Sequence, residues 1–282
     1  MEPSPIPEQG RSYATFLMLR ELTALQQPLT DPPHHDEMLF VIAHQVYELW
    51  FKEILHEVDA VVRKLDGGEA LEATRILRRC CVIENLLVAQ IDVLETMTTL
   101  DFLHFRDHLA PASGFDSSQF REVEYVSGLK NPKLLRSYAP DSPERARLEA
   151  RLAVPTLGDA FYGLLRRRGF DLPQPEEGSG EEVLKAACRT RLRELARLYR
   201  QRDRHLELFL LAEGLIEYDE LFMLWRLRHA QMAERFIGGR PGTGGSEGRS
   251  YLRSTADRPF FPDLWDVRDE LCKSPEQAEQ GH

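Results

Sequence analysis

The stretch that decides the fold is "DEMLFVIAHQVYELWFKEILHEVDAVVRKL", residues 36–65. Its apolar residues fall in two adjacent rows at helical spacing, one with Phe40, Tyr47, Phe51, Leu55 and Val58 and one with Leu39, Ile42, Val46, Leu49 and Ile54. So wide an apolar stripe predicts a long helix that is buried on most of its sides. Two prolines followed by an acidic first turn at Asp36 and Glu37 suit the start of that helix.

The same helical period recurs in residues 71–97 and 181–237, the second with a break expected near Gly214. Alternating strand patterns and internal repeats of fixed period are absent from the sequence. The expected fold class is therefore all-α, a helical bundle.

The helical pattern is less regular outside these stretches. Residues 126–180 carry turn signals around short helical pieces, and we expect them to form an excursion packed on the bundle. Residues 1–11 and 273–282 are polar and are expected to be flexible tails. The sequence thus predicts a single all-α domain over residues 12–272.

Composition narrows the class of protein. The 282 residues are 42% hydrophobic and 29% charged, as in soluble globular proteins, and the net charge of −10 argues against a nucleic-acid partner. No apolar run approaches the roughly 18–20 residues of a membrane span, so no membrane partner is expected. The first residues lack a secretion signal, which makes a cytoplasmic location the expectation. The four cysteines have no metal-binding spacing and are expected to be reduced.

Two histidines stand inside strongly apolar helical faces. His44 shares a face with Phe40, and His229 shares one with Trp225 and Met232. Each could be a core histidine with a hydrogen-bonded partner, or the pair could be facing ligands or a ligand and a base. An imidazole among aromatic residues also suits the axial ligand of a haem. The spacings of di-iron and zinc sites are absent, but spacing does not decide between a core histidine, a haem ligand and a base.

Arg106 lies among apolar residues in "LDFLHFRDHLAPASGF". A buried guanidinium needs an anionic partner. That partner could be an internal carboxylate such as Asp107 or Glu124, or the carboxylate of a substrate held by paired hydrogen bonds.

The stretch "GGRPGTGGSEGRSYLRST", residues 238–255, is rich in glycine but does not match a phosphate-binding loop. Gly245 stands where such a loop needs lysine, and a helix rather than a strand is expected before it. The plainer interpretation is a helix C-cap followed by a flexible linker.

Four stretches together resemble the tryptophan 2,3-dioxygenase family, in matching order and approximate spacing. They are "ALQQPLTDPPHHDEMLFVIAHQVYELWFKEILHE" (24–57), "LDFLHFRDHLAPASGFDSSQFRE" (100–122), "LWRLRHAQMAERFIG" (224–238) and "GTGGSEGRSYLRST" (242–255). The similarity runs from about Ser12 to Leu271.

The resemblance implies a homotetrameric, helical enzyme with b-type haem and with O2 as co-substrate. Its expected reaction inserts both oxygen atoms across the C2–C3 bond of the indole of L-tryptophan and gives N-formyl-L-kynurenine, the first step of tryptophan catabolism by the kynurenine route.

The resemblance also assigns roles at the cofactor. His229 matches the axial ligand of the haem iron, and Trp225 and Met232 stand beside it as cofactor-binding residues. His44 matches the distal histidine next to the indole N–H and is the expected catalytic residue, with Phe40 lining the same pocket.

Further positions match residues that hold the substrate. Phe102 corresponds to an aromatic wall and Arg106 to a clamp on the substrate carboxylate. Ser113 matches a serine of the distal pocket, and Thr243 a residue that contacts the ammonium and carboxylate groups as its loop closes. Tyr13 matches a tyrosine that one subunit lends to its neighbour's site.

Three positions depart from the family pattern: Phe16, Asp116 and Glu247. They leave open a haem monooxygenase of the same superfamily, acting in secondary metabolism on tryptophan or a substituted (for example β-methyl) tryptophan and forming an oxindole-type product. A haem-based gas sensor is a third hypothesis, although it would have no use for a clamp at Arg106. In each enzyme hypothesis the glycine-rich stretch becomes a lid over the substrate.

Overall fold

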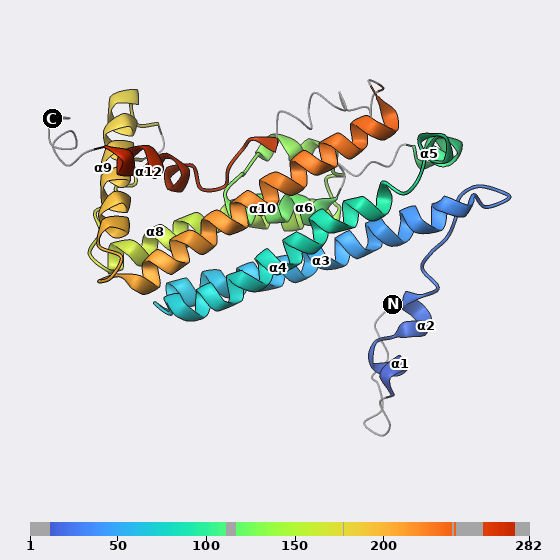
Figure 1. Cartoon of the computed structure of the whole chain (residues 1–282), viewed down its shortest axis with the longest axis horizontal. Coiled ribbons are helices and arrows are strands. Elements are labelled where there is room, and N and C mark those ends of the chain that lie inside the picture. The colour runs from blue at the N-terminus through green and yellow to red at the C-terminus, as the bar shows by residue number, and fades with distance from the viewer. Residues whose placement is uncertain (1–11, 111–116, 177, 239, 241–255, 274–282) are drawn as a thin grey trace.

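A computed structural model describes residues 12–110, 117–176, 178–238, 240 and 256–273 (Figure 1). Within these ranges every regular element is a helix, which confirms the predicted all-α class. The elements are α1 (Tyr13–Phe16), α2 (Leu19–Leu22), α3 (His35–Asp66), α4 (Ala70–Leu94), α5 (Thr99–Arg106), η1 (Asp107–Leu109), α6 (Ser118–Ser127), η3 (Pro132–Ser137), α7 (Pro143–Ala153), α8 (Leu157–Arg167), α9 (Glu181–Arg200), α10 (Leu206–Ile237) and α12 (Pro262–Cys272).

The long helices α3, α4 and α10 lie side by side and build the core (Figure 1). A capping box starts α3, because the His34 ring accepts from the backbone of the first turn and the Glu37 carboxylate accepts from the His34 N–H. Fully buried apolar side chains fill the space between the three helices, among them Ile54, Val58, Leu77, Leu87, Leu211, Leu215 and Phe222. The first predicted row of α3 packs against α4 and the core, with Tyr47, Phe51, Leu55 and Val58 buried. The second row is only partly buried: Ile42 and Leu49 are 43% and 51% exposed, so the prediction that α3 is buried on most of its sides was wrong for this face.

Two hydrogen bonds fix the register of α3 against α4. The Tyr47 hydroxyl donates to the Leu87 carbonyl at 3.0 Å, and the Gln90 amide donates to the Ala43 carbonyl at 2.7 Å. Both bonds flank His44, so its segment of α3 is held firmly in place.

The predicted break near Gly214 was wrong. The chain instead breaks at residues 201–205, and α10 runs without interruption through Gly214. A Cβ at Gly214 would lie 3.4 Å from Leu77 Cδ2, so the missing side chain lets α10 and α4 approach closely. Here glycine serves helix packing rather than helix termination.

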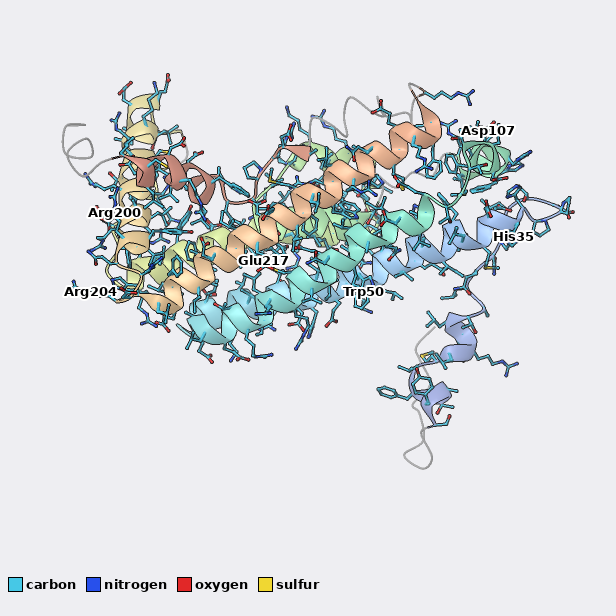
Figure 2. The ribbon with its side chains drawn as sticks, viewed as in Figure 1. His35, Trp50, Asp107, Arg200, Arg204 and Glu217 are labelled. Atoms are coloured by element: carbon cyan, nitrogen blue, oxygen red, sulfur yellow. The ribbon has the colours of Figure 1, made fainter. Side chains whose placement is uncertain are left out.

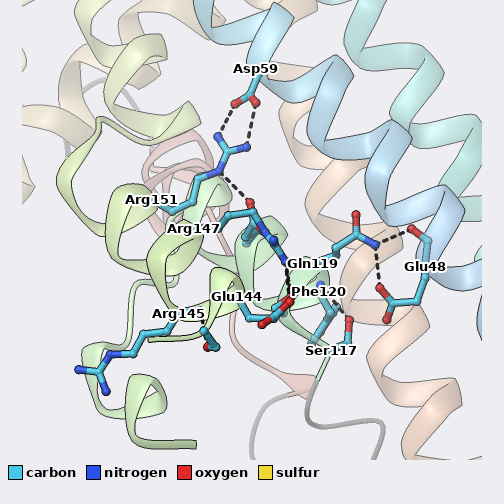
Figure 3. Close-up of polar contacts among 12 residues, drawn as sticks. Glu48, Asp59, Ser117, Gln119, Phe120, Glu144, Arg145, Arg147 and Arg151 are labelled. Atoms are coloured by element: carbon cyan, nitrogen blue, oxygen red, sulfur yellow. Dashed lines mark hydrogen bonds and ion pairs between the residues drawn. The ribbon is translucent and has the colours of Figure 1, made fainter. Parts of the chain in front are cut away.

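Shorter helices cover α3 on the side away from α4. Gln119 of α6 donates to the backbone carbonyl of Glu48 at 2.9 Å and to its carboxylate at 2.8 Å (Figure 3). Arg151 of α7 makes a two-pronged ion pair with Asp59 of α3 (Figure 3). These charge-assisted bonds attach the short helices to the middle of α3.

The two ends of the described chain differ. α12 packs against α9 at one end of the bundle, whereas α1 and α2 form an arm that projects away from it (Figure 1). No described helix is long and apolar enough to cross a lipid bilayer.

Candidate functional site

Three helices bring most of the predicted site residues together. α3 contributes Phe40 and His44, α5 contributes Phe102 and Arg106, and α10 contributes Trp225, His229 and Met232. The ring centroids of Phe40 and Phe102 are 5.8 Å apart, which joins α3 to α5. A charge on His44 would also lower the pKa of His229, so the two imidazoles of α3 and α10 lie within electrostatic reach of each other.

His44 has a defined tautomer. Its Nδ1 lies 2.7 Å from the Phe40 carbonyl oxygen, which can only accept, so Nδ1 carries the proton. Burial lowers the pKa of His44, against a smaller opposing effect of the Phe40 hydrogen bond and the Glu48 charge. The ring is therefore neutral near pH 7, and its Nε2 lone pair can accept a hydrogen bond.

His229 is an uncharged imidazole stacked on an indole. Its ring centroid is 5.3 Å from that of Trp225, with 21° between the planes. Burial, and next the charge of His44, lower the pKa of His229 to about 4, although part of its surface stays exposed. Within the described ranges no group is hydrogen-bonded to its ring, so it offers a nitrogen lone pair to a metal.

The surroundings of His229 are apolar and aromatic. Trp225 and Met232 are buried, and Phe120 of α6 packs against Trp225 with the ring centroids 5.2 Å apart. The Trp225 indole nitrogen is buried and makes no hydrogen bond of good geometry among the described residues, but it lies close enough to the Tyr47 hydroxyl to lower the pKa of that group. A neutral imidazole with a free nitrogen lone pair in an apolar, aromatic wall suits an axial haem ligand, so the residues present fit the group implied by the resemblance.

Arg106 ends α5, one turn beyond Phe102, with its side chain 13% exposed. Its Nη1 lies 3.6 Å from Asp107 Oδ1, which is too long for a hydrogen bond. Glu124, the other candidate internal partner, forms an ion pair with Arg121 at 2.6 Å. Of the two candidate internal partners, Asp107 is therefore the one near Arg106, at a long distance and on an exposed side chain.

An aromatic cluster that sequence reasoning missed completes the wall. Phe105 is fully buried and lies 5.5 Å from both Phe40 and Phe102, ring centroid to centroid. Phe120 likewise had no assigned role. The sequence does place Phe120 in the first turn of a helix capped by Ser117. That position does not show which residue the ring contacts, and only the packing of α6 brings it onto Trp225.

Of the other predicted site residues, Tyr13 alone belongs to the part of the chain that the structure describes. Ser113 and Thr243 lie outside the described residues, as do Asp116 and Glu247. Tyr13 is on α1 in the projecting arm, away from α5 and α10 and 76% exposed (Figure 1).

Comparison with known proteins gives one consistent result. The family model for tryptophan 2,3-dioxygenase matches residues 4–146 and 181–271. A tryptophan 2,3-dioxygenase of a Nocardioides species is 49% identical over 271 residues, covering 94% of this chain and 97% of the relative. The enzyme of that name from Herpetosiphon aurantiacus is 44% identical over 93% of this chain and 99% of its own length. The one from Anaeromyxobacter dehalogenans is 42% identical over 92% of this chain and 96% of its own length. Matches of this length and identity span α3, α5 and α10, which carry the site. The chain belongs to the tryptophan 2,3-dioxygenase family.

Proposed function

We propose that this protein is a haem-dependent dioxygenase that inserts both atoms of O2 across the indole C2–C3 bond of L-tryptophan and releases N-formyl-L-kynurenine. Family membership over nearly the whole chain supports the reaction. The observation that carries it is the arrangement of two neutral imidazoles, His44 and His229, on facing helices, with Arg106 at the edge of the same aromatic wall.

His229 is the residue that would hold the haem iron, and Trp225 and Met232 would pack beside the cofactor. When bound, the haem supplies the binding and activation of O2. The apolar side chains around His229 would keep water away from this side of the cofactor.

The chain's own part is to position the substrate. The Nε2 lone pair of His44 accepts a hydrogen bond from the indole N–H, because Nδ1 is committed to the Phe40 carbonyl. Arg106 binds the substrate carboxylate, and Phe40 and Phe102 enclose the ring. With both ends held, the reacting double bond has one orientation, so catalysis is largely by positioning. We assign Ser113 to the distal pocket and Thr243 to the amino-acid end on the resemblance alone.

We further propose a homotetramer in which Tyr13 completes a neighbouring subunit's site. The arm exposes large apolar side chains to solvent, including Phe16 at 64% and Met18 at 51%. Such a segment gains stability by packing on another subunit.

The experiment that tests the reaction is anaerobic reduction of the haem-loaded protein, addition of L-tryptophan and isotopically labelled O2, and mass analysis of the product. Incorporation of two labelled atoms in a ring-opened product is expected. A single labelled atom in an oxindole-type product would refute the proposal in favour of the monooxygenase hypothesis, which the relatives named above do not support.

A further inference from the structure

A separate group of metal-ligating side chains lies where the start of α3 meets α5. It comprises His34, Asp101 and His104, and one ligand atom from each lies within 4.8 Å of those of the other two. His34 is the N-cap residue of α3, and the other two residues are one turn apart on α5. Figure 2 shows that His35 and Asp107, which flank this junction, lie at the same end of the molecule.

The three ligand atoms lie near one another, but farther apart than around a bound ion. His34 Nε2 lies 3.7 Å from Asp101 Oδ1, and the rings of His34 and His104 stack with centroids 5.2 Å apart and 20° between planes. Ligand atoms around one tetrahedral zinc ion are about 3.3 Å apart, since each lies roughly 2.0–2.2 Å from the metal. To bind one ion, the side chains must move closer together and the His104 ring must rotate out of its stack on His34, which its exposed position allows.

Two of the three ligands are held in place by the fold. The Asp101 carboxylate accepts a hydrogen bond from the Thr98 hydroxyl, which in turn accepts from the Asp101 backbone N–H at 3.2 Å. The His34 ring packs against the buried Phe105, with the centroids 5.8 Å apart. Hydrogen bonding and packing of this kind orient metal ligands in known sites. The side chains of His34 and Asp101 are still 24% and 36% exposed, so an ion can reach them.

Binding would cost one hydrogen bond of the α3 cap. His34 Nδ1 accepts from the Asp36 N–H at 3.3 Å, which leaves the proton of the neutral ring on Nε2. A metal on Nε2 moves that proton to Nδ1 and breaks this long bond. The other half of the cap remains, because the Glu37 carboxylate accepts from the His34 N–H independently of the ring. This cost predicts weaker binding than in a closed structural zinc site.

We infer that His34, Asp101 and His104 form a site for a divalent transition-metal ion, best matched by Zn²⁺, that ties the start of α3 to α5. Two imidazoles and one carboxylate are ligands that suit Zn²⁺, whereas Mg²⁺ and Ca²⁺ favour oxygen ligands alone. Water completes the coordination. Because α5 also carries Phe102 and Arg106, an ion at this site restrains the helix that forms one wall of the pocket.

The test is equilibrium dialysis of the full-length, untagged protein against buffered Zn²⁺, with the bound metal measured by elemental analysis. The wild type is expected to bind one Zn²⁺ per chain with a dissociation constant on the order of micromolar. His104→Ala removes an exposed ligand without disturbing the core, and affinity should fall at least about tenfold. His108→Ala is the matched control, since His108 is also exposed, lies one turn further along and is outside the cluster; its affinity should equal that of the wild type.

Asp101→Asn is a second variant that keeps the side-chain shape and removes the charge, and it should weaken binding as well. Equal Zn²⁺ affinity in wild type, His104→Ala and Asp101→Asn would overturn the inference, as would the absence of stoichiometric binding. Dialysis against Mg²⁺ in place of Zn²⁺ should give no stoichiometric binding, and binding of Mg²⁺ as tight as that of Zn²⁺ would contradict the assigned ligand chemistry.

Discussion

The Arg106→Leu substitution tests the proposed capture of the substrate carboxylate. The Arg106 side chain is 13% exposed, and the carboxylate of Asp107 lies 3.6 Å away on a side chain that is 88% exposed. An ion pair this long and this open to water contributes little to stability. Leucine keeps the apolar contacts with the wall and removes the charge and the donors.

The size of the effect follows from the hydrogen bonds that are lost. A hydrogen bond to a charged group contributes about 1.5–3 kcal/mol, and a guanidinium can make two to one carboxylate. Taking about 3 kcal/mol for the pair, because the site stays partly open to water, L-tryptophan binding should weaken roughly 100-fold. Indole lacks the carboxylate, so its binding should change by less than about threefold.

The assay is a spectral titration of the haem-loaded protein with each ligand in turn, which gives two dissociation constants for each variant. Asp107→Asn is the control: it removes the neighbouring charge and keeps Arg106, and should leave both constants nearly unchanged. Equal losses for L-tryptophan and indole in Arg106→Leu would refute the clamp, because the substitution would then act on the pocket as a whole.

Four further predictions concern the axial ligand and the core. His229→Ala should prevent normal haem binding, checked by the absorption spectrum after reconstitution. In the haem-free wild type, burial lowers the pKa of His229 from 6.5 to about 4. Between these two pH values the imidazole is protonated in the unfolded state but not in the folded state. The free energy of unfolding should therefore fall by about 3 kcal/mol as the pH is lowered from 6.5 to 4. Asp219→Ala should lower the free energy of unfolding by about 3 kcal/mol in urea titrations, because the buried carboxylate accepts from two backbone N–H groups and from the Trp265 indole at 2.9–3.0 Å. Glu84→Leu should raise it by about 2 kcal/mol near neutral pH, because both Glu84 carboxyl oxygens are buried without a partner among the described residues and burial raises its pKa well above the usual range.

Each of these has a result that would contradict it. A normal haem spectrum in His229→Ala would remove the ligand assignment, and an unchanged pH slope in the haem-free form of that variant would show that other groups titrate in the window. Full stability of Asp219→Ala would mean that water replaces the carboxylate. Destabilisation of Glu84→Leu would show that the buried acid has a binding partner or a packing role.

The helices follow from local pattern, but their ends and contacts do not. The predicted helix over residues 36–65 is α3 to within one residue at each end, because its apolar stripe and its capping residues agree. The break predicted at Gly214 rested on the low helix propensity of glycine, which is a local effect. In the structure, glycine is placed there because Leu77 of another helix packs against it. The contact between His34 and the α5 residues Asp101 and His104 could not be predicted either, because it also depends on how two helices pack.

By itself, the sequence determined the helical class, the long buried helices and, through resemblance, the family and the residue types of the site. Only the tertiary structure decided which of those residues meet: that His44 lies within electrostatic reach of His229, that the His44 Nδ1 is bonded to the Phe40 carbonyl, and that the Phe120 ring packs on Trp225. Periodicity reports which face of a helix avoids water, and this depends on neighbours a few residues apart. The protonation state and partners of a buried imidazole depend on desolvation by helices far away in the chain, which no local pattern encodes.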